Sequence, residues 1–141
     1  MKAFFDTSVL VPVFLPDHVH HTASLARLQQ VDRKSGGCAA HSLAEVYSTL
    51  TRLPGKIRVT GEQAMLFVAD LRQKLSVTAL DADEYYEALG AAATRGISGG
   101  TVYDALLAAC AVKAGAKFIY TWNVRHYAQF GPDIASRIQM P

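Results

Sequence analysis

Ala3-Phe4-Phe5-Asp6-Thr7-Ser8 is the stretch of the chain that decides the fold. Its three apolar residues, ended by a carboxylate, predict a short buried strand and a helix that begins just after Asp6. Wholly apolar short strands are typical of parallel sheets, which helices cover on both faces. Sites in such folds collect beyond the carboxyl ends of the strands, so we expect Asp6 at the functional edge of the sheet.

Short apolar strands continue to alternate with helices along the chain. This order predicts an α/β fold, a three-layer α/β/α sandwich with a central, mainly parallel sheet. The length of 141 residues fits a single domain, which we expect to span residues 1–141. Further strands are expected at 38–40, 77–80, 117–120 and 134–138, and helices at 7–16, 20–31, 42–53, 61–74, 81–95 and 101–114.

The composition limits the possible classes of protein. Half of the residues are hydrophobic and 18% are charged, which is typical of a globular chain, and the net charge of +2 is too small to identify a nucleic-acid partner. The chain reaches Asp6 too early for a signal peptide and has no apolar stretch long enough to span a membrane. We therefore expect a cytoplasmic protein without a membrane partner. Cys38 and Cys110 are interpreted as buried thiols in a reducing compartment.

Three carboxylates have both a structural and a functional interpretation. Asp6 could cap the helix that follows it, and its local sequence supports capping and a site equally. Glu45 and Asp104 each follow a hydroxyl residue by three positions, which is the capping-box pattern. Taken singly, each of these two is better interpreted as a cap. The hydroxyl partners are Ser42 and Thr101, and the same pattern recurs at Asp81 with Glu84 and at Thr60 with Gln63.

The sequence after Asp104 favours a second role for that residue. Residues 105–111 are so apolar that their helix must be almost wholly buried, and an isolated charge near a core is costly unless a cation offsets it. Mg²⁺ and Mn²⁺ take oxygen ligands and can activate water for phosphodiester cleavage. Asp6, Glu45 and Asp104 are far apart in the sequence, so only the fold could bring them to one ion.

Four short motifs occur in order along the chain. They are Phe-Asp-Thr-Ser-Val-Leu at 5–10, Ser-Leu-Ala-Glu-Val at 42–46, Tyr-Asp-Ala-Leu-Leu-Ala at 103–108 and Thr-Trp-Asn-Val-Arg-His-Tyr at 121–127. Together they resemble the motifs of the PIN-domain family and of the VapC toxins within it. Each motif alone is weak, whereas four in the right order over nearly the whole chain are a strong signal.

The resemblance implies a PIN-like fold and a metal-dependent active site. By it, Asp6, Glu45 and Asp104 would bind the catalytic Mg²⁺ or Mn²⁺. Asn123 would be the fourth catalytic residue, and it stands where many members of the family carry Asp. Because an amide carries no charge, we expect one firmly held ion.

The resemblance also implies a substrate and partners. The activity would be an endoribonuclease that hydrolyses phosphodiester bonds in RNA, leaving 5′-phosphate and 3′-hydroxyl ends, as the toxin of a toxin–antitoxin pair. A cognate antitoxin protein would be one partner, and a second copy of the chain in a homodimer would be another. Thr7 or Thr121 would support the site through its hydroxyl.

Basic side chains could hold the RNA. Arg125 follows the fourth motif's Asn123 closely and could meet a phosphate. Arg52, Lys56 and Arg58 could do the same, although a solvated loop is the favoured interpretation for these three.

Aromatic and histidine side chains leave two further questions open. Trp122 could stack on a base, although a Trp this near a strand end more often packs as partly buried core. His18, His20 and His21 lack the cysteine or acid that would complete a zinc site, and they are interpreted as surface residues at a helix start.

Two other enzyme classes and one non-enzyme class share features with this sequence. An aspartyl-phosphate phosphatase usually carries a second Asp two residues after the first, where this chain has Ser8, and the phosphate loop of an NTPase is missing. The remaining alternative is a catalytically weak or inactive PIN-like module that binds RNA or a protein partner without cutting. Asn123 keeps that alternative open.

Overall fold

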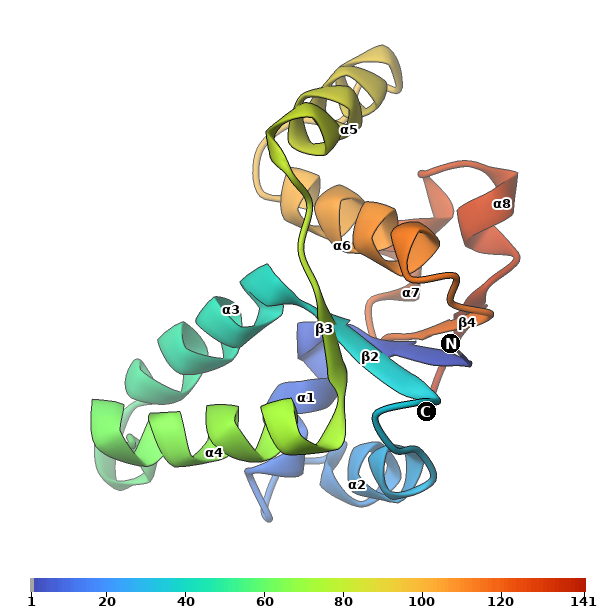
Figure 1. Ribbon diagram of the computed structural model, residues 1–141. Helices are drawn as coiled ribbons and strands as arrows, with labels where there is room; N and C mark the ends of the chain where they lie inside the picture. The colour runs from blue at the N-terminus through green and yellow to red at the C-terminus, as the bar shows by residue number, and fades with distance from the viewer. Residues whose placement is uncertain (1) are drawn as a thin grey trace.

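The computed structural model describes residues 2–141. At its centre is a five-stranded sheet in the order β3-β2-β1-β4-β5, and every pairing is parallel (Figure 1). The prediction of an α/β fold with a mainly parallel sheet is therefore confirmed. The strands are β1 (Ala3–Phe5), β2 (Gly36–Ala39), β3 (Ser76–Thr78), β4 (Phe118–Tyr120) and β5 (Ile138–Gln139).

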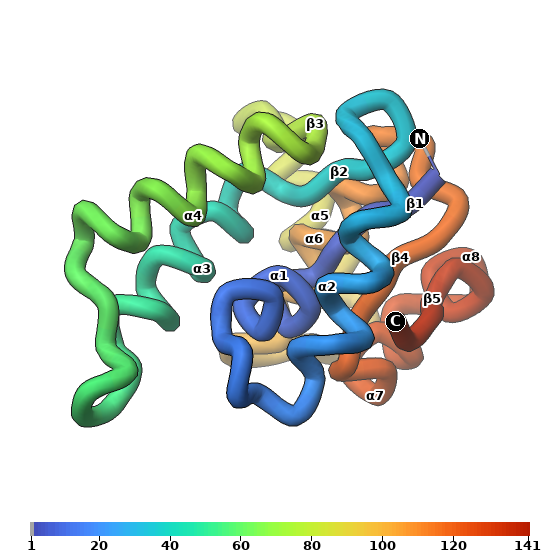
Figure 2. Tube along the Cα trace, turned by 90° about the horizontal axis from the view of Figure 1, so that it is seen from below, coloured from blue at the N-terminus to red at the C-terminus, as the bar shows by residue number. Residues whose placement is uncertain are grey.

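Helices cover both faces of this sheet and complete the three layers. Helices α1 to α4 lie on one side and α5 to α8 on the other, as the two perpendicular views show (Figures 1 and 2). The helices are α1 (Thr7–Val13), α2 (His21–Gln29), α3 (Ala40–Thr51), α4 (Gly61–Lys74), α5 (Ala82–Thr94), α6 (Thr101–Lys113), α7 (Val124–Ala128) and α8 (Pro132–Ala135), with a short 3₁₀ turn at Gly55–Ile57.

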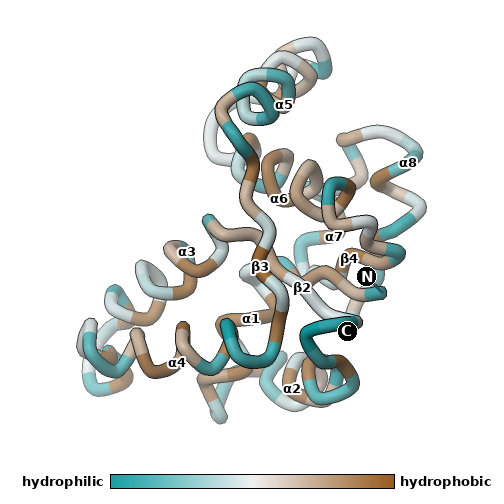
Figure 3. Tube along the Cα trace, in the orientation of Figure 1, coloured by the Kyte–Doolittle hydropathy of each residue, from teal (hydrophilic) through white to brown (hydrophobic). Residues whose placement is uncertain are grey.

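Strand β1 joins the two hydrophobic cores. Because successive side chains of a strand point to opposite faces, Ala3 and Phe5 belong to the core beneath α1–α4, while Phe4 belongs to the core beneath α6. Both phenylalanines are fully buried. Helix α6 is mostly brown in the hydropathy view, whereas teal marks the polar loop between α2 and β2 (Figure 3). Burial on both faces explains why β1 is apolar at every position.

The end of the chain differs from the prediction. The prediction of a strand at 134–138 is wrong. Pro132 begins helix α8 in this region, and the last strand contains only Ile138–Gln139. Helix α7 is absent from the prediction, since five residues are too few to show a helical period. The first helix stops at Val13, earlier than expected.

The two cysteines and the lengths of the apolar helices were also predicted from the sequence. Cys38 and Cys110 are free and buried, as expected, and burial raises the pKa of the Cys38 thiol to about 12. Within residues 2–141, no helix combines the length and the apolar character needed to cross a bilayer. The cytoplasmic location stays a prediction.

Candidate active site

The carboxyl ends of β1 and β4 position the first residues of the site. Strand β1 pairs with β2 on one side and with β4 on the other, so the chain changes direction across the sheet at β1. Such a switch point leaves a crevice beyond the strand ends, where α/β proteins bind ligands. Asp6 directly follows β1 and Thr121 directly follows β4, which places both at this crevice.

A pocket of about 450 Å³ lies at the crevice. Asp6, Glu45 and Asp104 all line it, so three carboxylates from the start of α1, from α3 and from α6 face one space. Other lining residues are Thr7, Ser8, His18, His20, Trp122 and Asn123.

Asp6 is held rigidly by three hydroxyl groups. Its Oδ2 accepts a hydrogen bond from Ser8 Oγ at 2.7 Å and another from Thr121 Oγ1 at 2.8 Å. Its Oδ1 accepts one from the hydroxyl of Tyr127 at 2.9 Å. The side chain is nearly buried, and these neutral donors satisfy the carboxylate without cancelling its charge.

None of the three carboxylates caps a helix. Asp6 occupies the N-cap position of α1, but its side chain makes no capping bond. Helix α3 begins after Ala39 and α6 begins after Gly100, again without a side-chain cap. The capping interpretation of Glu45 and Asp104 is therefore wrong, because each helix starts at a different residue from the one that the pattern required.

Two other copies of the same pattern do form capping boxes. At Thr60 with Gln63 and at Asp81 with Glu84, both reciprocal hydrogen bonds are present. The three-residue spacing therefore marks a cap at α4 and α5 and a pocket residue at α3 and α6. Local sequence does not distinguish the two cases.

Glu45 lies on α3, one turn after His41. Its Oε1 accepts a hydrogen bond from Thr7 Oγ1 at 3.3 Å, and His41 Nε2 lies 3.6 Å from the same oxygen. Burial, and then the charge of Asp6, raise the pKa of Glu45 above its ordinary value, while the Thr7 hydrogen bond opposes the rise.

Asp104 lies in the first turn of α6 and is held by the fourth motif. Its Oδ2 lies 2.9 Å from His126 Nδ1, which is on α7. Burial, followed by the charge of Asp6, raises the pKa of Asp104, and His126 opposes the rise. Asp6 therefore acts on both of the other carboxylates, which shows that the pocket concentrates negative charge.

The donor set of the pocket fits a hard divalent cation in kind. Asp6, Glu45 and Asp104 offer carboxylate oxygens and Asn123 an amide oxygen, which are the ligands that Mg²⁺ and Mn²⁺ prefer. A cation would also offset the two causes that raise the pKa values of Glu45 and Asp104, which are burial first and the charge of Asp6 second. In the part of the chain from residue 2 onward, no three His, Cys, Asp or Glu side chains already form a group that could hold a metal ion. The predicted ligand set therefore stays a prediction.

The two predicted supporting threonines have separate tasks. Thr7 donates to Glu45, whereas Thr121 donates to Asp6 and accepts a hydrogen bond from the backbone N–H of Asn123 at 2.9 Å. Thr121 is completely buried. It therefore connects the end of β4 to both the central carboxylate and the start of α7.

The predicted basic residues lie outside the pocket lining. Arg125 is exposed on α7 and is not among the residues that line the pocket. Arg52, Lys56 and Arg58 lie between α3 and α4, at the far end of that helix pair from the sheet (Figure 1). Arg58 Nε donates to the carbonyl of Leu53 at 2.8 Å and so stabilises the loop. Their role in binding RNA stays a prediction.

Ser8 and Tyr127 belong to the site, although the sequence alone predicts no role there for either residue. Ser8 lies two residues after Asp6, and its hydroxyl also lies 3.3 Å from Thr121 Oγ1. Tyr127 is fully buried, and burial with the charge of Asp6 raises the pKa of its phenol well above the ordinary value. Tyr127 belongs to the fourth motif, but only the unpredicted helix α7 turns it toward Asp6.

Comparison with known proteins places the chain in a family. The family model described as PIN domain matches residues 3–129. Ribonuclease VapC40 of Mycobacterium tuberculosis is 36% identical over 114 residues, which are 81% of this chain and 81% of the relative. Ribonuclease VapC27 of the same organism is 34% identical over 113 residues, 79% of this chain and 78% of that protein.

Solved structures share the fold at lower identity. The crystal structure of M. tuberculosis VapC20, described as a sarcin-ricin loop cleaving toxin, covers 90% of this chain and 94% of its own, with a TM-score of 0.71 and 20% identity. VapBC2 from Rickettsia felis, bound to a DNA fragment from the promoter, covers 99% and 98%, with a TM-score of 0.66 and 17% identity. With the carboxylate pocket at the switch point of the sheet, these findings show that the chain belongs to the PIN-domain family, in its VapC-like branch.

Proposed function

We propose that the chain is a metal-dependent endoribonuclease that hydrolyses phosphodiester bonds in RNA, as the toxin of a toxin–antitoxin pair. The observation that carries the proposal is the convergence of Asp6, Glu45 and Asp104 on one pocket. Relatives named ribonucleases, at 36% and 34% identity, support it. The whole of residues 1–141 would act as one PIN-like domain.

The residues of the pocket would divide the work between them. Asp6, Glu45 and Asp104 would hold Mg²⁺ or Mn²⁺, which supplies positive charge for the phosphate and lowers the pKa of bound water. Asp6 is already fixed by its three donors and would provide the rigid ligand. Thr7 orients Glu45 and His126 orients Asp104, so each of these two would keep its carboxylate facing the pocket.

The catalytically inactive alternative is less well supported. An RNA-binding module without activity has no use for three carboxylates, because they repel phosphates unless a cation is present. Asn123 lines the pocket and would position water or a phosphate oxygen through its amide. The three acids therefore favour cutting over binding alone.

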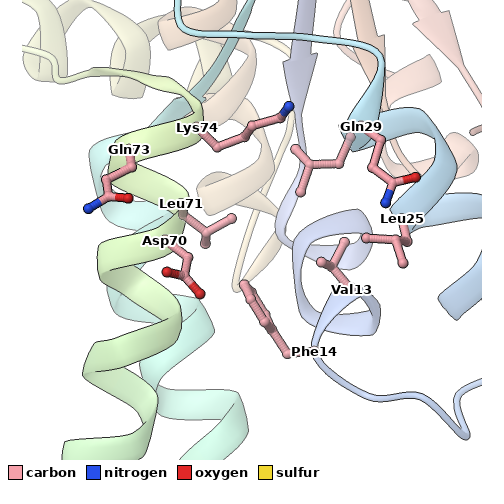
Figure 4. Close-up of a pocket in the computed structure, with 9 residues that line it drawn as sticks. Val13, Phe14, Leu25, Gln29, Asp70, Leu71, Gln73 and Lys74 are labelled. Atoms are coloured by element: carbon pink, nitrogen blue, oxygen red, sulfur yellow. The ribbon is translucent and has the colours of Figure 1, made fainter.

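A groove between α4 and the α1–α2 pair is the surface that we assign to the antitoxin (Figure 4). The groove has a volume of about 430 Å³. In Figure 4, Val13 and Leu25 come from the α1–α2 side and Leu71 from α4, and all three point into the space. Asp70 and Lys74 lie along the α4 edge. Such a surface suits an antitoxin segment that has apolar side chains on one face, with a basic and an acidic side chain beside them to pair with Asp70 and Lys74.

Related complexes support an antitoxin as the occupant of the groove. A toxin–antitoxin complex from Klebsiella pneumoniae and VapBC-1 from Haemophilus influenzae share the fold, with TM-scores of 0.66 and 0.67. Replacing Leu25 with Glu should abolish co-purification with the antitoxin while leaving RNA cleavage intact. Co-purification at wild-type levels would contradict this assignment.

We also propose a homodimer. Tyr85, Tyr86 and Leu89 leave large apolar side chains exposed on α5, and Tyr86 is 81% exposed. An exposed aromatic cluster of this kind commonly marks an interface. Light scattering should give twice the chain mass for the wild type and the single mass for Tyr86→Asp, whereas a monomeric wild type would contradict the proposal.

The nuclease is tested with a labelled RNA pool, the purified protein, and Mg²⁺, Mn²⁺ or EDTA. Asp104→Asn should lower cleavage by about 100-fold or more, the effect of losing about 3 kcal/mol of charge stabilisation. Asp83→Asn is the matched control, because Asp83 also lies in the first turn of a helix but is exposed on α5. It should cut as the wild type does.

The cleavage assay distinguishes the proposed nuclease from the inactive RNA-binding module. Metal-dependent cutting that Asp104→Asn loses and Asp83→Asn keeps would support the proposed function. Equal cutting in EDTA, or by Asp104→Asn, would exclude it. RNA binding without cutting by the wild type would establish the inactive module instead.

A further inference from the structure

One wall of the carboxylate pocket consists of three aromatic rings from distant parts of the chain. The ring of His20 lies parallel to the indole of Trp122, with the centroids 3.7 Å apart and the planes at 8°. The ring of His18 continues the row, 5.6 Å from His20 and tilted by 39°. We call these three residues the aromatic wall.

The aromatic wall is held in place from both sides. Trp122 donates from Nε1 to Ser24 Oγ at 3.0 Å and from its backbone N–H to Ser8 Oγ at 3.0 Å. His18 Nδ1 accepts the backbone N–H of His20 at 3.0 Å, which fixes the loop before α2. Ser8 also donates to Asp6, so the wall is tied directly to the carboxylate site.

The side chains of the wall differ in exposure. Trp122 is half-buried and packs against the core beneath α1–α4. One side of the indole is therefore part of the core, as the structural alternative predicted. His20 is half-buried as well, whereas His18 is exposed. The indole therefore serves as the rigid base of a stack whose outer members, the two histidines, face the pocket and solvent.

The pocket combines two chemistries that RNA would use together. All three members of the wall line the same space as Asp6, Glu45 and Asp104. The carboxylates, with their cation, suit the sugar–phosphate chain, and flat rings suit the face of a base. A nucleotide carries both groups within one residue, so one strand could engage both surfaces.

We propose that the aromatic wall is a base-binding subsite, on which one unpaired base of the RNA stacks beside the bond that is cut. The inference rests on the proposed nuclease function and deepens it, because it names the form of RNA that the site accepts. Bases inside a duplex are already stacked on their neighbours, so the subsite selects single-stranded or looped RNA. Stacking accepts any base, so the wall places a nucleotide without reading its identity.

Trp122 gives a direct signal for the test, because it is the only tryptophan in the chain. RNA binding to the Asp104→Asn variant in Mg²⁺ is followed by tryptophan fluorescence, with short single-stranded oligonucleotides that carry one abasic position each. Stacking on the wall should quench or shift the emission. One abasic position, and not the others, should weaken binding by about ten-fold.

Variants of His20 make the assignment specific. In the Asp104→Asn background, His20→Ala should weaken binding of the intact oligonucleotide by about ten-fold and should remove the sensitivity to the abasic position. His20→Phe should restore both, because it keeps a flat ring. Leu66→Ala, which removes an exposed apolar side chain on α4 outside the carboxylate pocket and the proposed interfaces, is the control and should bind as its parent does.

The outcomes separate this inference from the nuclease itself. If the wild type cuts RNA but no abasic position matters, or if His20→Ala binds as tightly as its parent, the base-binding subsite is wrong and the nuclease stands. If the His20→Ala variant does not fold, the oligonucleotides with abasic positions test the base-binding subsite without it. If double-stranded RNA binds as tightly as single-stranded RNA, the proposed selection is also wrong.

Discussion

Asp6 and the other two pocket carboxylates have different surroundings. Asp6 accepts three hydrogen bonds from hydroxyl groups, whereas Asp104 contacts the ring of His126 and, more weakly, the hydroxyl of Tyr127. Several donors fix the position of a buried carboxylate, and a buried carboxylate with fewer donors is easier to protonate. Asp6 is therefore the most firmly positioned carboxylate of the site, whereas burial, followed by the charge of Asp6, raises the pKa values of Glu45 and Asp104.

Replacing Asp104 with Asn should stabilise the metal-free protein. The folded pKa of Asp104 is raised above its unfolded value of 3.8. Between these two pKa values the folded wild type keeps a proton that the unfolded chain has lost, so the wild type loses stability as the pH rises. The stability difference between variant and wild type should be near zero at the acid end and should grow as the pH rises through the folded pKa. It should then stay constant.

Urea unfolding in EDTA at several pH values measures this difference. Asp83→Asn should show no such growth with pH, because Asp83 is exposed. A variant that is less stable than the wild type at neutral pH would show that the carboxylate is already compensated.

Replacing Tyr127 with Phe should destabilise the fold without a change in shape. The substitution removes one donor from the buried Asp6 and leaves the aromatic ring in place. Losing a hydrogen bond to a charged group costs about 1.5–3 kcal/mol. Chemical denaturation measures the loss, and Tyr103→Phe, whose side chain is more than half exposed on α6, should leave the unfolding free energy unchanged. An equally small effect for both variants would mean that water replaces the Tyr127 hydroxyl.

At the scale of elements, the starts of the helices separate structural from functional side chains. Helices α4 and α5 begin with complete capping boxes, and their starts lie on the surface. Helices α3 and α6 begin without any side-chain cap. Glu45 and Asp104, near those two starts, therefore face the pocket. The protein gives up the stabilisation that a side-chain cap would add to each helix.

Matched alanine substitutions should reveal this difference. Thr60→Ala removes a cap and should lower the unfolding free energy by about 1 kcal/mol. Ser42→Ala should be neutral or stabilising, because Ser42 is completely buried and its hydroxyl has no hydrogen-bond partner among residues 2–141. Thermal unfolding of both variants gives the comparison. A loss of stability in Ser42→Ala as large as in Thr60→Ala would show that the serine hydroxyl has a partner.

At the scale of the whole molecule, the fold class was predictable and the site was only partly so. The apolar run Ala3–Phe5 predicted a buried strand, and its position in the centre of a parallel sheet placed Asp6 at the functional edge. Glu45 could be chosen only through the order of the family's motifs, because its local pattern indicated a cap. For Asp104, the apolar helix that follows it also favoured a second role.

Some of the site could not be predicted from local sequence at all. Tyr127 reaches Asp6 across 121 residues, and no local rule joins the two. The short helix α7 that turns Tyr127 and His126 inward has too few residues to show a period. Contacts of this kind depend on the complete tertiary structure, which the alternation of strands and helices does not specify.

A divalent cation should stabilise the whole molecule by binding to the native state alone. At 100 times its dissociation constant, Mg²⁺ should add about 2.7 kcal/mol to the unfolding free energy, and EDTA should reverse the gain. Glu45→Gln should lose most of this gain, whereas Glu87→Gln, on the exposed face of α5, should keep it. Calorimetry with and without Mg²⁺ measures both. A full gain in Glu45→Gln would remove that residue from the proposed ligand set.

The hydrogen bond from Thr121 to Asp6 spans 115 residues, and it therefore matters in which order the chain is made. During synthesis, Asp6 appears first, but its strand lacks β4 and its carboxylate lacks Thr121 and Tyr127. At about 5–20 residues per second, the ribosome needs about 6–24 s to supply both residues. A nascent or interrupted chain thus carries the first acid of the site without the means to position it. If the chain is the proposed toxin, its activity would begin only once translation is nearly complete, and an antitoxin made earlier could bind it at that point.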